Sequence, residues 1–203
     1  MDPREHWERV HRSTAASEVS WFQEVPECSL AMIEAAGIGP GARVINVGGG
    51  ASRLVDHLLD RGYRSLTVLD ISGSALELGR RRLGHRAALV EWIEADITAS
   101  APRGRFDLWH DRAVFHFLTE PDHQRAYANA LNACLAPKAH AVIATFAEDG
   151  PKRCSGLDVV RYSPQLLCST LGSGLELVTS RHEQHQTPNG TVQSFVYCLF
   201  RRV

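Results

Sequence analysis

The feature that most constrains this chain is the segment from Arg43 to Asp70, in which a short apolar run, a glycine cluster, an amphipathic stretch and a second apolar run follow one another. The run at 44–47 is β-branched, which is typical of a buried strand in a parallel sheet. The three glycines at 48–50 allow close backbone approaches that a side chain would block. The segment therefore predicts a strand–turn–helix–strand unit that ends in a carboxylate.

A glycine turn followed about 20 residues later by an acid is the nucleotide-binding pattern of doubly wound sheets, in which the acid binds ribose hydroxyls. Gly48 and Gly50 supply the first two glycines of the GxGxxG pattern, but Arg53 stands where a dinucleotide site needs a small residue. This disfavours NAD. A ligand with a ribose and no phosphates needs only the turn and Asp70, and S-adenosylmethionine is the common ligand of this kind. The alternative is a turn that binds nothing.

Length and composition indicate one ordinary globular domain. We expect a single domain over residues 1–203, with a helical cap at 1–40 and a Rossmann-like core at 41–203. A net charge of −1 gives no positive field for nucleic acid, so we expect no nucleic-acid partner. The charged start and the lack of a long apolar run predict a cytoplasmic protein that does not enter a membrane.

The cysteines and histidines do not form a metal-binding pattern. The five cysteines are scattered without a CxxC spacing, and the ten histidines include no HExxH motif, so we expect no metal. Four cysteines fall in predicted helices or strands and are expected to be buried. Cys154 lies in a polar loop, and we expect it to be exposed.

Apolar runs alternate with amphipathic stretches along the chain, and two runs joined by a Pro-Asn-Gly turn close it. This order predicts an α/β fold with a Rossmann-like, mostly parallel sheet of seven strands, helices on both faces and an antiparallel hairpin at one edge. The predicted strands are 44–47, 66–70, 89–93, 106–110, 141–146, 175–181 and 192–200.

The cap carries two aromatic side chains and an amide in the segment Ser20-Trp21-Phe22-Gln23. One interpretation is that they pack the cap onto the sheet. The other is that Trp21 and Gln23 cover the cofactor or substrate, because an indole face attracts a cation and a sulfonium is one.

Polar groups follow the third and fourth predicted strands, at the sheet edge where ligands of open α/β folds bind. Asp96 could accept a hydrogen bond from an adenine amino group with Ile97 against the ring, or it could cap a helix. His110 or His116 could serve as a base, with Asp111 orienting it. His116 could equally face the core. The loop at 147–162 is long enough for a lid.

The glycine turn, the acids after the second and third strands, the segment from Phe106 to Leu118 and the closing hairpin resemble the class I S-adenosylmethionine-dependent methyltransferases. The resemblance spans nearly the whole chain and is most specific from Val44 to Asp111. The opening residues and the fourth-strand segment are similar to a small bacterial subgroup, akin to methyltransferase-like lysine methyltransferases and, loosely, thiopurine-type enzymes.

The resemblance implies that the glycine turn lies beside the methionine part of the cofactor and Asp70 on its ribose. It also implies that Ile71 flanks the adenine, and that His110 and Asp111 lie near the transferable methyl. The expected cofactor site consists of Trp21, Asn46, Gly48, Gly49, Gly50, Asp70, Ile71, Ser72, Asp96, Ile97 and Asp111.

One position departs from the family pattern. Where the family usually has an acid two residues before the first glycine, this chain has Asn46, which lacks the charge that attracts the cofactor's ammonium. The departure implies either weaker cofactor binding or an inactive relative.

Three functions follow as hypotheses. The first is methyl transfer by in-line displacement to a small, partly apolar acceptor, with His110, Asp111 and His116 as catalytic residues. The second is methylation of a protein lysine, and the third is a noncatalytic cofactor-binding module. In the first, the acceptor is expected to contact Trp21, Gln23, His116, Phe146 and Tyr162.

Overall fold

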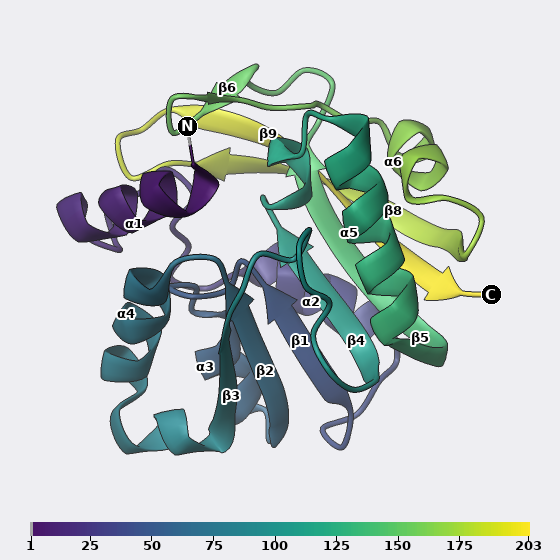
Figure 1. Cartoon of the computed structure of the whole chain (residues 1–203), viewed down its shortest axis with the longest axis horizontal. Helices are drawn as coiled ribbons and strands as arrows, with labels where there is room; N and C mark the ends of the chain where they lie inside the picture. Colours follow the sequence, from purple (N-terminus) through teal and green to yellow (C-terminus); the bar gives the residue numbers. More distant parts are fainter. Residues whose placement is uncertain (1) are drawn as a thin grey trace.

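The computed structural model describes residues 2–203 and contains a sheet of seven strands (Figure 1). The strands are β1 (Arg43–Val47), β2 (Ser65–Asp70), β3 (Val90–Glu94), β4 (Phe106–Arg112), β5 (Leu135–Phe146), β8 (Leu175–Gln186) and β9 (Val192–Arg202). Their order is β3-β2-β1-β4-β5-β9-β8, with β9 antiparallel to both of its neighbours and the other pairs parallel. The predicted fold class is confirmed.

Helices cover both faces of this sheet. They are α1 (Pro3–Ser13), α2 (Glu27–Ala35), α3 (Leu54–Asp60), α4 (Gly73–Leu83), α5 (Pro121–Cys134) and α6 (Pro164–Leu171), with short 3₁₀ turns η1 (Gly84–Leu89) and η2 (Phe115–Phe117). In Figure 1, α5 and α6 lie in front of the sheet, and α2 and α3 lie behind it. Each face has its own apolar cluster, since residues of α5 and α6 join one cluster and residues of α2, α3 and α4 join the other.

Alternation along the central strands divides their side chains between these two clusters. In β1, Val44 packs on the α2–α3 face and Ile45 on the α5 face. In β4, Leu108 and Trp109 divide in the same way. The alternation continues to the carboxyl ends of the strands, and it decides there which polar side chains reach a cleft and which face a helix.

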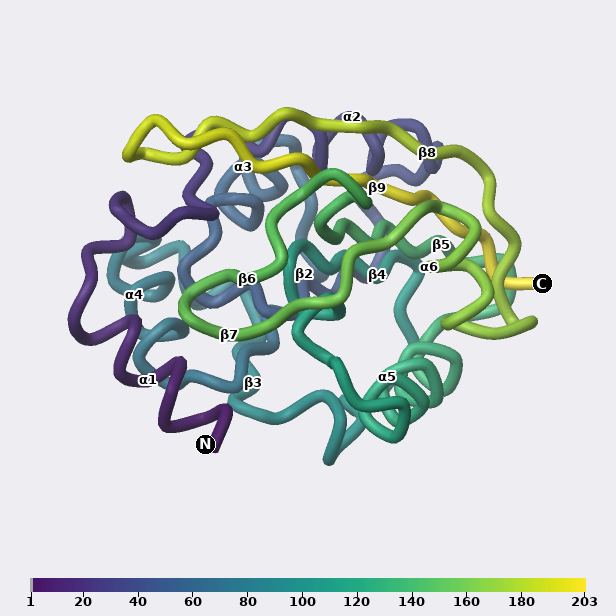
Figure 2. The backbone as a smooth tube through the Cα atoms, turned by 90° about the horizontal axis from the view of Figure 1, so that it is seen from above, coloured from purple at the N-terminus to yellow at the C-terminus, as the bar shows by residue number. Residues whose placement is uncertain are grey.

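The cap covers the carboxyl edge of the first half of the sheet, where Figure 2 shows α1 beside α4 and the small β6–β7 hairpin crossing over the strand ends. The hairpin consists of β6 (Arg153–Cys154) and β7 (Leu157–Asp158). Glu8 of α1 accepts hydrogen bonds from Ser72 Oγ and Ser74 N, both at 3.0 Å, at the start of α4. Burial raises the pKa of Glu8, but the hydrogen bonds from Ser74 and Ser72 outweigh it and bring the pKa down to about 2.

All seven predicted strands are present, and the structure corrects three details. β5 begins at Leu135 rather than at residue 141, directly after α5 ends at Cys134. The stretch 147–162 contains the β6–β7 hairpin and is not a plain loop. Cys154 is buried, not exposed, because this hairpin folds it against the cluster on the α2–α3 face. Among residues 2–203, no helix is long and apolar enough to cross a membrane.

Candidate functional site

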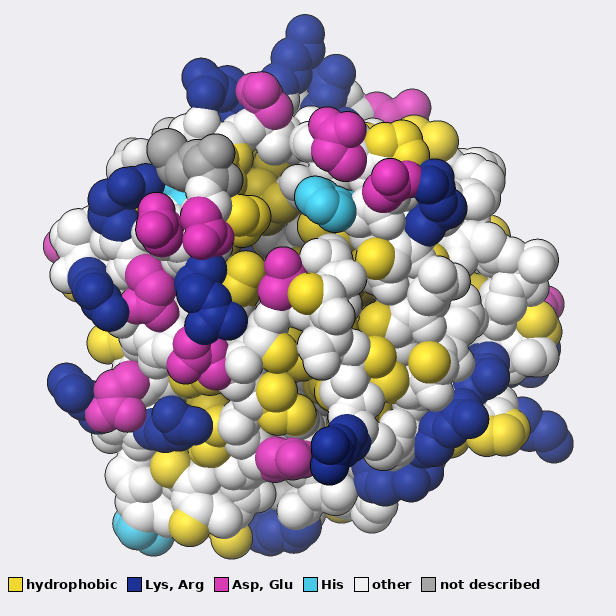
Figure 3. Space-filling model, viewed as in Figure 1, with side chains coloured by type: hydrophobic (Ala, Val, Ile, Leu, Met, Phe, Trp, Pro, Cys, Tyr) yellow, Lys and Arg dark blue, Asp and Glu magenta, His cyan; other side chains and the backbone are white. Residues whose placement is uncertain are grey.

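A cleft of about 440 Å³ lies at the carboxyl ends of β1, β2, β3 and β4, beneath α1 and the β6–β7 hairpin. We call it the large cleft. In Figure 3, hydrophobic side chains show through a hollow in the molecular surface near the N-terminus. The lining includes Trp7, His11, Trp21, Gly48, Asp70, Ile71, Asp96, Ile97, Arg112 and Phe117. Most of the predicted adenine and ribose contacts therefore lie together at one site.

Asp70, the last residue of β2, is held rigidly at the floor of this cleft. Its Oδ2 accepts a hydrogen bond from Gly50 N at 3.0 Å, and its Oδ1 accepts one from Ser72 N at 2.9 Å. Burial raises the pKa of Asp70, while the two amides and the nearby His11 favour its charged form. The remaining lone pairs of the carboxylate are available to hydroxyl donors in the cleft.

The glycine turn brings the backbone close to the same cleft. Gly48 has a φ of +64°, and a Cβ at this position would lie 2.0 Å from Cγ2 of Val114. A side chain is therefore excluded at Gly48 both by conformation and by space. Gly49 and Gly50 do not line the cleft; Gly49 packs on Asn46, and Gly50 donates to Asp70. Gly50 therefore helps to hold the acid in position.

The end of β3 forms the far wall of the large cleft. Oδ1 of Asp96 accepts hydrogen bonds from N and Oγ1 of Thr98, at 2.8 and 2.7 Å, so part of the carboxylate stabilises its own turn. Asp96 caps a turn and not a helix, and it lines the cleft, so its contact with an adenine amino group stays a prediction. Ile71 and the buried Ile97 supply apolar surface beside it.

An aromatic cluster closes the cleft on the side of the cap. Trp7 contacts Trp21 and Phe117 edge to face, with ring centroids 5.7 and 4.9 Å apart. The packing interpretation of Trp21 is therefore confirmed, and its indole also lines the cleft, while a contact with the cofactor or substrate stays a prediction. Gln23 instead donates from Nε2 to Glu183 Oε1 at 3.0 Å, which ties the cap to β8.

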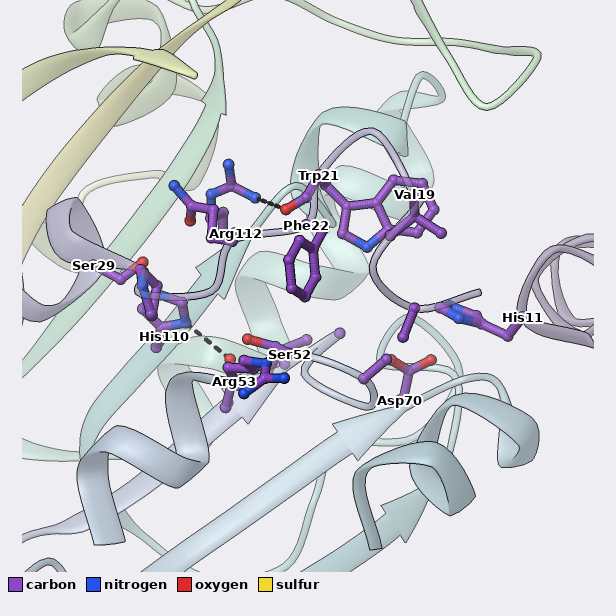
Figure 4. A pocket seen from close by; sticks show the side chains of 17 residues that line it. His11, Val19, Trp21, Phe22, Ser29, Ser52, Arg53, Asp70, His110 and Arg112 are labelled. Atoms are coloured by element: carbon purple, nitrogen blue, oxygen red, sulfur yellow. Dashed lines mark hydrogen bonds between the residues drawn. The ribbon is translucent and has the colours of Figure 1, made fainter. Parts of the chain in front are cut away.

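A second, smaller pocket of about 60 Å³ adjoins the large cleft at Gly48 and Asp70 (Figure 4). We call it the small pocket. His110 lines it and is held between two partners, with Nδ1 2.8 Å from Asn46 Oδ1 and Nε2 2.9 Å from Ser29 Oγ. Because an amide oxygen only accepts, His110 carries its proton on Nδ1. Burial, assisted by Arg112, lowers the pKa of His110 to about 3, so the ring stays neutral near pH 7.

Two arginines also line the small pocket. Arg112 donates from Nε to Tyr197 Oη at 2.7 Å and from Nη1 to the Trp21 carbonyl at 2.9 Å, the latter drawn in Figure 4. Its guanidinium also lies 4.5 Å from the centroid of the Phe195 ring. Arg53 pairs with Glu24 through Nη1 at 2.7 Å. Arg112 thus links the segment between α1 and α2 to the sheet.

Asp111 is not at either cavity, which corrects its predicted catalytic and cofactor roles. Alternation directs it to the α5 face, where it is fully buried. Its carboxylate accepts hydrogen bonds from Val114 N at 2.9 Å, Phe115 N at 3.1 Å and Tyr127 Oη at 2.5 Å. Burial raises the pKa of Asp111 to about 7, although these hydrogen bonds oppose the shift.

His116, Phe146 and Tyr162 are likewise in the core, which corrects the predicted acceptor contacts. His116 Nδ1 accepts a hydrogen bond from Phe146 N at 3.3 Å, and its ring packs against the ring of Phe146. Burial, with Arg112 nearby, lowers the pKa of His116 to about 3. A fully buried, neutral imidazole with no exposure to either cavity is not placed to take a proton from an acceptor. Ser72 is also buried away from the cleft, where it caps α4.

Residue patterns gave little sign of several side chains that do line the site. His11 borders both cavities and faces Asp70, as Figure 4 shows. Its spacing of four from Trp7 on one helical face was the available signal. Arg53 departs from the GxGxxG pattern, but the sequence does not indicate that its side chain points into the small pocket. Arg112 comes after the predicted strand at 106–110, and the side of the sheet to which its side chain points depends on the alternation along that strand.

The comparisons with known proteins agree with this geometry. Residues 44–138 match the family model described as "Methyltransferase domain". A structure of the N-methyltransferase NodS from Bradyrhizobium japonicum in complex with S-adenosyl-L-homocysteine is 18% identical, with a TM-score of 0.73 over 96% of this chain and 97% of that one. The match over residues 44–138 and the shared fold agree with the predicted class, the class I S-adenosylmethionine-dependent methyltransferases.

Two further relatives differ in what they are described as acting on. A Burkholderia thailandensis 1,6-didemethyltoxoflavin N1-methyltransferase structure is 19% identical, with a TM-score of 0.70 over 98% of this chain and 87% of that one. An "eEF1A lysine and N-terminal methyltransferase" of Danio rerio is 29% identical over 111 residues, which is 54% of this chain and 16% of that relative. One acts on a small molecule and the other on a protein.

Proposed function

We propose that this protein transfers a methyl group from S-adenosylmethionine to a small, partly apolar acceptor enclosed in the large cleft. The observation that carries the proposal is the arrangement of Asp70, Asp96 and the Gly48 backbone around one cleft whose remaining wall is aromatic. Acids at the ends of two neighbouring strands suit the ribose and adenine of the cofactor. The aromatic wall suits a sulfonium and an apolar acceptor.

The residues present fit this cofactor on the basis of two features. The carboxylate of Asp70 is buried and fixed by two amides, as a ribose-binding acid requires. Gly48 lines the cleft, and Val114 packs against it in the space where a Cβ would lie, so the turn and the end of β4 meet closely at this wall. When bound, S-adenosylmethionine supplies an activated methyl group on a sulfonium. Asp70 would hold the ribose, and Ile71 and Ile97 would enclose the adenine.

The contribution of the chain to the reaction is then positioning. A methyl displacement requires the nucleophile to lie near the methyl and opposite the sulfur, and a fixed geometry supplies much of the rate. Trp21 and Phe117 exclude water from the cleft and restrict where an acceptor can lie. His110 stays neutral and hydrogen-bonded on both sides, so it supports the wall of the small pocket and does not exchange protons.

Enclosure of the cleft favours a small acceptor over a protein. Glu8 and Arg4 of α1 bind Ser74 and Glu94, which keeps the helix over the edge of the sheet. The buried Cys154 holds the β6–β7 hairpin down on the other side of the opening. A lysine side chain on a folded protein would have to enter between these two elements.

The test is incubation of the protein with radiolabelled S-adenosylmethionine and a cell extract separated by size. We expect label to enter the small-molecule fraction. A control with Asp70→Asn should lose most of the transfer, because it weakens cofactor binding. Label confined to the protein fraction would overturn the small acceptor, and label in neither fraction would overturn the activity.

The second candidate is methylation of a protein lysine, and the Danio rerio relative is the observation that favours it. The matched stretch covers 16% of that relative, so most of the relative lies outside the comparison. Label on protein lysines in the same experiment would favour this candidate.

A further inference from the structure

Residues 20–24, between α1 and α2, pack on the molecule without helix or strand of their own. We call them the connecting segment. They include Trp21, whose indole lines both the large cleft and the small pocket. Backbone groups of an irregular segment must find their hydrogen-bond partners elsewhere in the protein. The position of this aromatic wall therefore depends on the side chains that bind the connecting segment.

Two carbonyls of the connecting segment are bound by side chains from the sheet. His185 of β8 has its Nε2 2.8 Å from the Ser20 carbonyl oxygen, and because a carbonyl only accepts, Nε2 carries the proton and donates. Arg112 of β4 donates to the Trp21 carbonyl at 2.9 Å (Figure 4). These carbonyls belong to the peptide groups on either side of the Trp21 Cα. The two bonds thus fix the backbone from which the indole projects.

Glu183 of β8 joins a third anchor to the other two. Its Oε1 accepts a hydrogen bond from Gln23 Nε2, and its Oε2 accepts one from Tyr197 Oη, both at 3.0 Å. Tyr197 Oη in turn accepts from Arg112 Nε at 2.7 Å. The side chains of Glu183 and Arg112 are only 17% and 10% exposed, so this polar network is largely shielded from water.

The second half of β8 carries polar side chains where it faces the protein. An antiparallel strand with one covered face usually turns apolar side chains inward. Between residues 181 and 186, however, the less exposed positions are Glu183 and His185. Neither residue lines the large cleft or the small pocket. In Figure 2 the turn end of the β8–β9 hairpin lies beside the segment that joins α1 to α2, where these two side chains are used.

We propose that Glu183 and His185 are positioning residues for methyl transfer, which act by holding Trp21 at the wall of the large cleft. The inference rests on the proposed function, in which Trp21 borders the acceptor. Asp70, the proposed ribose ligand, is held by Gly50 and Ser72 instead. Loss of the network should therefore raise the KM of the acceptor and leave the affinity for the nucleoside part of the cofactor unchanged.

The first experiment observes Trp21 directly and needs no acceptor. The protein is labelled with 5-fluorotryptophan, and the fluorine resonance of Trp21 is identified by its loss in Trp21→Phe. Glu183→Ala and His185→Leu should each shift or broaden this resonance. The resonance of Trp109, which is fully buried on the α5 face, should stay unchanged and show that the sheet is intact.

The same strand supplies matched controls. Glu176→Ala and His182→Leu make the same chemical changes at exposed positions of β8 and should leave the Trp21 resonance in place. His185→Gln keeps an N–H donor at a similar reach and should restore the resonance. If Glu183→Ala does not fold, Gln23→Ala, at a partly exposed position, removes the same hydrogen bond from the other side.

The second experiment measures initial rates with radiolabelled S-adenosylmethionine against increasing amounts of the small-molecule fraction of a cell extract. Glu183→Ala and His185→Leu should each raise the apparent KM for that fraction about threefold to tenfold, the size of one lost hydrogen bond. We expect kcat to stay unchanged, together with the calorimetric affinity for S-adenosyl-L-homocysteine.

Three results would overturn the inference. They are a Trp21 resonance that does not respond to either variant, an apparent KM that does not rise although the resonance moves, and an equal loss of affinity for S-adenosyl-L-homocysteine. If the unchanged protein transfers no label, the proposed function fails. The fluorine spectra would still decide whether Glu183 and His185 hold Trp21 in place.

Discussion

Two aspartates end strands of the same sheet and are used in opposite ways. Asp70 closes β2 and Asp111 lies near the end of β4; both are buried, and both accept hydrogen bonds from two backbone amides. Asp70 also borders the large cleft, whereas Asp111 receives a third bond, from Tyr127, and is sealed under α5. The same residue type at the same edge of the sheet thus serves a ligand in one place and the fold in the other.

Strand parity accounts for the difference. Asp70 shares the face of Leu66 and Val68, which pack on the α3–α4 side where the glycine turn lies. Asp111 shares the face of Trp109, on the α5 side. A position at the carboxyl end of a strand is therefore not sufficient for a functional role. The side chain must also point to the face of the sheet on which the glycine turn lies.

The largest expected effect is on stability, from Asp111→Ala. The substitution leaves three buried donors without an acceptor, and we expect the free energy of unfolding to fall by roughly 3 kcal/mol or more. Urea unfolding measures the change. Asp122→Ala, which removes an exposed carboxylate on α5, is the control and should stay within about 0.5 kcal/mol. Equal losses in the two variants would contradict the structural role of Asp111.

The next effect separates the two aspartates by ligand binding. Asp70→Asn should weaken S-adenosyl-L-homocysteine by roughly 1 to 3 kcal/mol, because a charged acceptor for the ribose hydroxyls is lost. Asp111→Asn keeps the side chain's size on the other face, and the affinity should stay within about threefold. Calorimetry at 25 °C measures both. Similar losses would show that the cofactor does not distinguish the two faces of the sheet.

Asp111 also predicts a pH dependence of stability. Its pKa is about 7 in the folded protein and near 3.8 when unfolded, so the folded state retains a proton that the unfolded state releases. The contribution of this bound proton to the free energy of unfolding is complete below about pH 4 and is lost as the pH rises through about 7. The stability difference between the unchanged protein and Asp111→Asn should therefore fall with pH, by at most about 1.4 kcal/mol per unit. Unfolding free energies at intervals from pH 4 to pH 8 measure it, and a difference that does not vary would rule out the buried proton.

The part of the site that could be predicted from sequence is local. Asp70 ends the second strand of one βαβ unit, after a strand, a glycine turn and a helix. The hydrogen bond from Gly50 N to the Asp70 carboxylate is made inside that unit. Ile71, Asp96 and Ile97 come directly after two strands of the same half. Short-range pattern therefore determines this end of the cleft.

The rest depends on contacts between distant segments. In the stretch Phe-Asp-Leu-Trp-His-Asp-Arg, buried and polar side chains occur on both faces, so alternation alone does not tell which face meets α5. Arg112 acquires its role from Trp21, Tyr197 and Glu183, which are far away in the chain. The β6–β7 hairpin has two-residue strands, too short to produce a periodic signal.

The smallest expected effect concerns His116, the side chain that sequence made a candidate base. In the structure His116 is buried beside Phe146 and lines neither cavity. Its pKa of about 3 keeps it neutral. His116→Gln should lower stability, because the replacement must fit a packed core, but methyl transfer per folded molecule should change by less than about twofold.

Initial rates with radiolabelled S-adenosylmethionine, divided by the concentration of folded protein from circular dichroism, measure this. Trp21→Leu is the positive control, because it opens the aromatic wall of the cleft and should raise KM for the acceptor. A loss of about 100-fold in kcat for His116→Gln would be the size expected for a general base. That outcome would require the 3₁₀ turn at 115–117 to rearrange on binding, since in the structure the imidazole accepts its hydrogen bond from within the sheet.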